Sequence, residues 1–265
     1  MRIIVPIKQV PETKNVKMDE KTGTVIREGV QSIVNPLDLY SIELALQLKK
    51  SHDCEVVAIT MGPEKAKLAL KEAISMGADS GILLSDRAFG GSDTWATGYV
   101  LAEAIKKIGD YDMVICGERA TDGDTGQVGP GIAAFLDIPV LSYVSRMKEI
   151  SDSCCTIERM VEEGHEVLSC SLPVVLTVVK EIGDPRLPTL RGKQRAKRSD
   201  IPAWDYKTLN IEPDTVGLKG SPTRVVKIFK PQVTRQCQMF QATDEIAVQR
   251  LVETLFGQLS QKEVL

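Results

Sequence analysis

Short apolar runs alternate with amphipathic segments along the first half of the chain, and this alternation constrains the fold more than any other feature. The apolar runs predict buried strands over residues 1–8, 55–60, 80–85, 111–116 and 139–144. Helical periodicity predicts helices from residue 35 onward and over residues 64–76, 94–108 and 131–136. Asn35 is expected to cap the first of these helices, with Pro36 in its first turn. Strands and helices in this order form right-handed β-α-β units, so the sequence predicts a doubly wound, mainly parallel α/β sheet.

The pattern changes after residue 150. Residues 156–160 and 165–169 read as two strands of a hairpin, and residues 172–179 as a further buried strand. Residues 193–238 combine few apolar runs with several prolines and many charges, which predicts an extended arm; residues 244–259 have helical periodicity. An arm and one terminal helix cannot bury themselves alone, so we expect both to pack on a partner subunit.

Composition limits the chemistry that the side chains supply. The chain has only two histidines, His52 and His165, and its six cysteines form no C-x-x-C pair. This disfavours a histidine metal centre, a Ser-His-Asp triad, a zinc ribbon and a dithiol redox motif, and it points to a bound cofactor. No residue stands out as a catalytic acid or base.

Charge and hydropathy limit the partners and the compartment. The formal net charge is -3 and the isoelectric point is about 5.6, which argues against nucleic-acid binding. No leader-like segment opens the chain and no apolar run reaches the length of a membrane span, so the sequence predicts a cytoplasmic protein with reduced cysteines.

A ligand site is expected where the parallel strands end, because ligands bind open α/β sheets outside the carboxyl ends of the strands. Four segments leave such ends: residues 6–10, 35–38, 60–63 and 117–130. In the last segment Gly123, Gly126 and Gly129 allow close backbone approach, and the following helix N-terminus favours a phosphate. Neither G-x-G-x-x-G nor a P-loop is present. An ordinary solvated loop, or a cation site at Asp122 and Asp124, are the alternatives.

A basic segment follows the last predicted strand. Six basic residues fall between Arg186 and Arg198, beside the apolar Leu187 and Leu190. The segment is either a solvated face or a docking loop for an acidic partner, with the two leucines as apolar anchors.

With these segments described, the chain resembles the beta subunit of electron transfer flavoproteins over essentially its whole length. The most specific likeness spans residues 157–177, where seven residues fit the family signature: Arg159, Glu162, Glu163, Gly164, Glu166, Pro173 and Thr177. Residues 7–11, 35–36 and 76–79 are similar too.

This resemblance implies a heterodimer with an alpha subunit that carries FAD. It implies a fold of the adenine-nucleotide alpha-hydrolase and universal-stress type, with residues 1–190 as a nucleotide- or flavin-binding domain and residues 191–265 as the arm and terminal helix on the alpha subunit. The implied nucleotide site consists of Pro6, Asn35, Pro36, Leu37, Asp38, Met61, Asp122, Gly123, Asp124, Thr125, Gly126, Gln127, Val128, Gly129, Pro130, Gly131, Ile132 and Ala133.

The family divides according to what fills this site. One branch holds AMP; the other holds a second FAD and binds NADH, which permits electron bifurcation in anaerobic energy metabolism. Gly123 and Gly126 make the loop here similar to the second branch. The implied mechanism takes electrons from NADH and sends them singly through the alpha-subunit FAD to a partner dehydrogenase and to ferredoxin. The partner is an acyl-CoA dehydrogenase or a lactate-type (2-hydroxyacid) dehydrogenase.

Residues 184–192 are similar to the family's partner-recognition loop, which gives docking roles to Arg186, Leu187, Leu190 and Arg191. A third hypothesis, from another class, is a nucleotide-sensing module of the universal-stress type.

Overall fold

The computed structural model describes residues 1–12, 17–18, 25–26, 32–226, 239 and 246–262. The chain divides into two units, Met1–Lys227 and Ile228–Leu265. In the described part of the chain, no helix is both long enough and apolar enough to cross a membrane.

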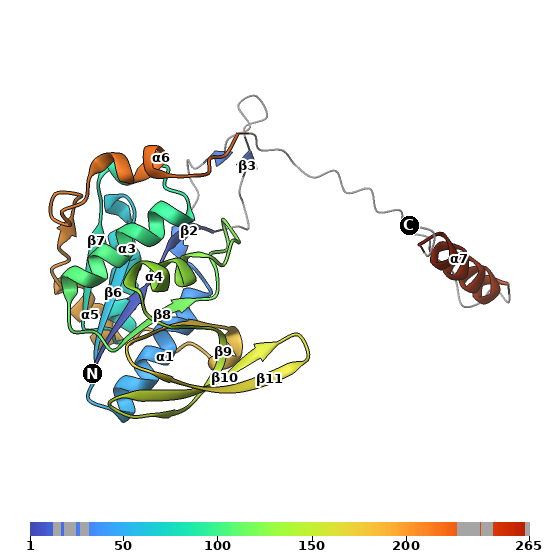
Figure 1. Cartoon of the computed structure of the whole chain (residues 1–265), viewed down its shortest axis with the longest axis horizontal. Helices are drawn as coiled ribbons and strands as arrows, with labels where there is room; N and C mark the ends of the chain where they lie inside the picture. Colours follow the sequence, from blue (N-terminus) through green and yellow to red (C-terminus); the bar gives the residue numbers. More distant parts are fainter. Residues whose placement is uncertain (13–16, 19–24, 27–31, 227–238, 240–245, 263–265) are drawn as a thin grey trace. The chain divides into compact units, whose positions relative to one another are not determined.

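The first unit is built on a nine-stranded sheet with the order β11-β10-β9-β12-β8-β1-β6-β7-β13 (Figure 1). Its parallel part comprises β1 (Arg2–Pro6), β6 (Glu55–Met61), β7 (Ser80–Leu84), β8 (Met113–Gly117), β12 (Val174–Val178) and the start of β9 (Val140–Ile150). These strands lie where the apolar runs predict them, because a strand covered on both faces needs a nearly continuous apolar sequence.

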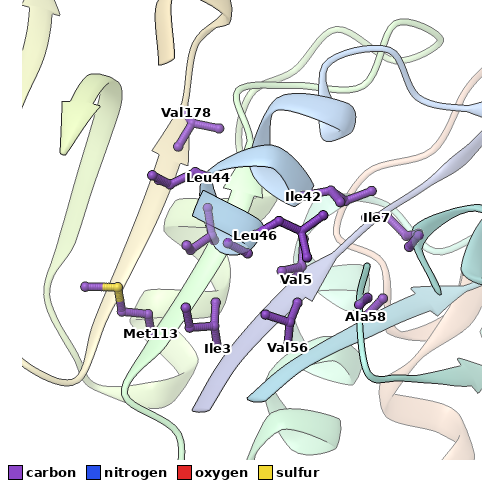
Figure 2. Packing of buried hydrophobic residues seen from close by; sticks show 14 of the residues in the cluster. Ile3, Val5, Ile7, Ile42, Leu44, Leu46, Val56, Ala58, Met113 and Val178 are labelled. Atoms are coloured by element: carbon purple, nitrogen blue, oxygen red, sulfur yellow. The ribbon is translucent and has the colours of Figure 1, made fainter. Parts of the chain in front are cut away.

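Helices cover both faces of the sheet, which confirms the doubly wound prediction. They are α1 (Asp38–Ser51), α2 (Lys67–Met76), α3 (Thr94–Ile108), α4 (Val128–Leu136) and α5 (Leu190–Arg198), with short 3-10 turns η2 (Glu64–Ala66), η3 (Arg87–Phe89) and η4 (Lys180–Ile182). Successive side chains of a strand point to opposite faces of the sheet. Ile3 and Val5 therefore pack in the core under α1 and α2, whereas Ile4 packs in the core under α3 and α4. Figure 2 shows Ile42 and Leu46 of α1 above the first of these cores.

The predicted hairpin is present at the other end of the sheet. β10 (Cys154–Val161) and β11 (Gly164–Ser171) pair antiparallel, with Glu162 and Glu163 in the turn. β9 pairs parallel with β12 and antiparallel with β10, so it joins the parallel and antiparallel parts of the sheet. Arg159 and Glu166 of the signature face each other across the hairpin in an ion pair of 2.7 Å.

Between β1 and α1 the chain makes an excursion. β2 (Gln9–Pro11) pairs antiparallel with β5 (Ser32–Val34), and β3 (Lys17–Met18) pairs with β4 (Val25–Ile26). The first pair brings the two ends of the excursion together beside the carboxyl end of β1.

The prediction of an extended arm over residues 193–238 is wrong for residues 193–226. Residues up to 198 belong to α5, β13 (Ala203–Trp204) pairs with the sheet edge at β7, and η5 (Pro213–Thr215) and α6 (Gly217–Gly220) follow. The compact unit therefore extends beyond the predicted boundary at residue 190. The segment is held by a few scattered buried apolar residues that form no sustained helical or strand pattern: Ala196, Ile201, Leu209, Ile211 and Val216. Residues 227–238 of the predicted arm lie outside the described residues.

The second unit contains helix α7 (Ala247–Lys262), close to the predicted residues 244–259. Its first predicted residues, 244 and 245, lie outside the described part of the chain.

Candidate functional site

A cleft of about 320 Å³ opens at the carboxyl ends of β1, β6 and β8. The strand order reverses here: β6 and β7 lie on one side of β1, while β8 and β12 lie on the other. At such a point the loops after neighbouring strands run to opposite faces of the sheet and leave a crevice between them. Ligands bind in this crevice in open α/β folds.

The loop between β8 and α4 forms one wall of the cleft. It begins at Gly117, where a side chain would collide with Leu37 and Asp38, so the loop packs directly against the start of α1. Gly126 has a positive φ of 62° that suits glycine. A Cβ on Gly123 would meet no atom within 4 Å, so this position faces open space at the cleft lining.

Asn35 and Asp38 hold this loop in place. The Asn35 amide donates to the Arg119 carbonyl and to Asp38 Oδ1, both at 2.9 Å, and its Oδ1 accepts from the Thr121 backbone N–H at 3.1 Å. Asp38 Oδ2 accepts from the backbone N–H of Lys8 at 2.6 Å. The predicted capping role of Asn35 is wrong: α1 begins at Asp38 and no side chain caps it, because the Asn35 side chain is committed to the loop.

Asp38 is buried, and this burial raises its pKa to about 7. Hydrogen bonds from Asn35 and from the Lys8 backbone oppose the rise, as does the charge of Lys8, while Asp122 adds to it. A carboxyl group that titrates near neutral pH thus lines the cleft.

The N-terminus of α3 forms the opposite wall, which the sequence analysis missed. Asp93 caps this helix by accepting from the Ala96 backbone N–H at 3.1 Å, and Thr94 Oγ1 donates to Gln127 Oε1 at 3.0 Å. The signal was present, since Asp93 follows a Gly-Gly-Ser turn directly before a helical pattern. Which strand ends adjoin this turn depends on the strand order, which the sequence pattern does not give.

The structure brings only part of the predicted site to the cleft. The predicted residues that line it are Pro6, Asp38, Met61, Gly123, Asp124, Thr125, Gly126, Gln127, Val128 and Gly129. The predicted residues outside the lining are Asn35, Pro36, Leu37, Asp122, Pro130, Gly131, Ile132 and Ala133. Ile132 and Ala133 point into the core instead. Lining residues not predicted are Ile7, Lys8, Ser92, Asp93, Thr94, Thr97, Leu101, Cys116, Gly117, Glu118, Arg119 and Ala120.

The two loop aspartates face basic side chains. Lys8 Nζ lies 2.7 Å from Asp122 Oδ1, and Arg119 Nε lies 3.2 Å from Asp124 Oδ1. Both carboxylates are paired in this way, so the geometry does not favour the cation alternative. Among the described residues, no three His, Cys, Asp or Glu side chains gather as metal ligands.

The predicted docking residues separate into two kinds. Leu187 and Leu190 are 84% and 82% exposed, whereas the guanidinium of Arg186 pairs with Glu43 of α1. Arg191 is exposed at the start of α5. The leucines project outward, and Arg186 holds their loop to the body of the unit.

Comparison with known proteins agrees with this fold. The electron transfer flavoprotein domain model matches residues 22–209. The chain is 47% identical over 238 residues to the electron transfer flavoprotein subunit beta of Megasphaera elsdenii, which covers 87% of this chain and 88% of that protein. The chain therefore belongs to the electron transfer flavoprotein family.

Within the family, the chain is similar to beta subunits along nearly its whole length, as the resemblance predicted. It is 44% identical over 266 residues to a subunit of the caffeyl-CoA reductase-Etf complex of Acetobacterium woodii, with 100% of both chains covered. It is 42% identical over 262 residues to the acryloyl-CoA reductase electron transfer subunit gamma of Anaerotignum propionicum, covering 96% of this chain and 98% of that protein.

Proposed function

We propose that the cleft binds FAD, with NAD(H) beside it, and that the chain works in the cytoplasm as the beta subunit of a heterodimer with an FAD-carrying alpha subunit. When bound, the flavin would supply hydride and single-electron transfer between NADH, the alpha-subunit FAD and ferredoxin. The task of this chain is then to bind and orient the cofactor. Family membership leaves the nucleotide-sensing hypothesis without support.

The proposal rests on one observation, the open space beside Gly123 in the cleft. A side chain at Gly123 would occupy space in front of the β8–α4 loop, and glycine leaves that space to a ligand larger than a mononucleotide. The AMP alternative needs no such opening. Its branch of the family has a bulkier, more acidic loop at these positions.

The walls of the cleft fit the phosphates of a dinucleotide. Among the described residues no side chain caps α4, so its first backbone N–H groups remain available to a phosphate, whereas the Asp93 carboxylate already caps α3 across the cleft. Lys8 and Arg119 also line the cleft, but their charges are paired with Asp122 and Asp124, so the proposed phosphate contacts come from backbone N–H groups. The volume of about 320 Å³ lies at the lower end of ligand pockets, and it would hold the adenine-nucleotide part of the cofactor.

The names of the relatives favour one partner over the other. Two relatives at 44% and 42% identity belong to the caffeyl-CoA reductase and acryloyl-CoA reductase systems. We therefore propose that electrons pass to or from an acyl-CoA dehydrogenase type of flavin enzyme rather than a lactate-type dehydrogenase.

Anaerobic titration of the purified heterodimer with NADH tests this function. We expect the visible absorbance of the flavin to fall on stoichiometric addition of NADH. A flavin spectrum that NADH leaves unchanged, while dithionite bleaches it, would contradict an NAD(H) site beside a beta-subunit flavin.

A further inference from the structure

The segment from Asp184 to Gly192 presents two large apolar side chains to solvent. Leu187 and Leu190 are among the most exposed leucines in the described part of the chain, at 84% and 82%. Exposed leucines on a loose loop would collapse onto nearby apolar surface. The position of this segment therefore needs a physical cause.

Glu43 supplies one anchor for the segment. It lies in the middle of α1 with its carboxylate buried, and it receives three hydrogen bonds from Arg186. Arg186 Nε and backbone N donate to Oε2 at 2.8 and 3.0 Å, and Nη2 donates to Oε1 at 2.9 Å. Gln47, one turn further along α1, adds a fourth hydrogen bond to Oε1 at 3.2 Å.

A second anchor lies on the other side of the leucines. The hydroxyl of Thr189 caps α5 by accepting from the Gly192 backbone N–H at 2.9 Å. Arg195 Nη2 donates to the carbonyls of Ile74 and Ala78 at 2.8 and 2.7 Å, which fixes α5 to the end of α2. The two leucines thus lie between a contact with α1 and a contact with α2.

A buried carboxylate is costly, and exchanging a buried ion pair for apolar residues is often neutral or stabilising. An apolar residue at position 43 would serve the core as well as glutamate does. Glutamate differs from an apolar residue because its carboxylate accepts two hydrogen bonds from the Arg186 guanidinium. These bonds fix the distance and the orientation of the loop backbone relative to α1.

We infer that Glu43 and Arg186 form a positioning pair, which holds Leu187 and Leu190 in the conformation that an apolar pocket on the partner flavin dehydrogenase accepts. The inference rests on the role of this segment as the docking site, which the family resemblance implies and which we propose here. Arg186 then acts from within the loop and does not itself touch the partner. Fixing the loop before association lowers the ordering cost of binding, so the pair acts on affinity and not on electron transfer within the bound complex.

Steady-state electron transfer between the FAD-loaded heterodimer and its partner dehydrogenase tests this role. Glu43→Gln and Arg186→Lys each remove the bidentate ion pair and keep a polar side chain of similar size. We expect each variant to raise KM for the partner about tenfold, equivalent to ~1.4 kcal/mol, with kcat and FAD content unchanged. Hydrogen exchange at residues 184–190 should become faster in both variants.

Glu55→Gln is the matched control. Glu55 also pairs with an arginine, Arg2, at 2.7 Å, but at the amino-terminal ends of β1 and β6 and without a contact to Arg186. We expect KM to stay at the wild-type value in this variant. A loss of kcat or FAD content in Glu43→Gln, together with the change in KM, would assign Glu43 a general structural role and overturn the inference.

Leu190→Ala separates this inference from the docking proposal on which it rests. If Leu190→Ala raises KM and Glu43→Gln does not, docking stands and the positioning pair is refuted. If Leu190→Ala leaves KM unchanged, the segment is not the docking site, and both proposals fail whatever Glu43→Gln does. A rise of KM in both variants, with kcat intact, is the supporting result.

Discussion

Single side chains set the shape and the charge of the cleft. Asn35 and Asp38 connect the end of β1, the start of α1 and the β8–α4 loop through four hydrogen bonds of 2.6 to 3.1 Å. Both residues belong to the predicted ligand site, but Asn35 lies behind the wall of the cleft and does not line it. A residue that organises a wall and a residue that lines it look alike in a sequence, because both follow the carboxyl end of a strand.

Asp38 leads to a prediction about pH. Its pKa is raised to about 7 from 3.8, so the folded chain binds more protons than the unfolded chain between these values. The stability of the ligand-free protein should therefore fall as pH rises through this window, by at most about 4 kcal/mol at 1.36 kcal/mol per pKa unit. Carbon-13 NMR of labelled aspartate carboxyls, assigned with Asp38→Asn, measures the midpoint. A value near 7 is expected, and a value near 4 contradicts the assigned burial.

Gly123 leads to a prediction about the ligand. Gly123→Asp would place a carboxylate at the open part of the cleft, where its Cβ meets no protein atom within 4 Å and the side chain competes with a flavin for space. We expect the variant heterodimer to fold normally and to lose one of its two FAD molecules. Ser153→Asp introduces the same group in an exposed turn of the β9–β10 connection and should keep both. Equal FAD content in the two variants would show that the pocket assignment is wrong.

At the scale of elements, the sequence predicted the parallel strands and the four helices between them. Strands buried on both faces, such as β1 and β12, are continuous apolar runs and are easily recognised. Helix α5 was missed because only Ala196 of its nine residues is buried, so the helix has no apolar stripe. The α3 wall of the cleft was missed for a different reason: the strand order that brings α3 and α4 together is a tertiary property.

The long side chain of Arg195 is one of the contacts that attach helix α5. Arg195 donates to the carbonyls of Ile74 and Ala78 at the end of α2, where a cation also complements the helix dipole. Because Arg195 is largely exposed, we expect Arg195→Gln to lower the free energy of unfolding by only about 1 kcal/mol. Lys197→Gln on the same helix, with an exposed side chain, should change it by less than ~0.5 kcal/mol. Urea unfolding followed by circular dichroism measures both, and equal effects would argue against the helix-capping role of Arg195.

At the scale of the whole molecule, the chain has one compact unit and a second unit in which the described residues form mainly helix α7. Within that second unit, Leu251, Val252 and Leu255 of α7 are 38%, 45% and 51% exposed. A lone amphipathic helix is marginal in water and gains stability by packing its apolar face. We propose that the alpha subunit covers this face.

Truncation after Lys227 tests the proposed role of the second unit. The shortened chain should retain the sheet and its circular dichroism, because the elements of the sheet all lie in the first unit. We expect it to lose co-purification with the alpha subunit. Undiminished heterodimer formation by the shortened chain, at micromolar concentration, would mean that the first unit alone provides the interface.

The central claim is that the cleft holds a flavin dinucleotide and not a mononucleotide. The direct test is the nucleotide content of the heterodimer, purified from its native host, denatured and separated by liquid chromatography. The account predicts two FAD per heterodimer and no AMP. One FAD with one AMP per heterodimer would contradict it and would establish the AMP-binding alternative.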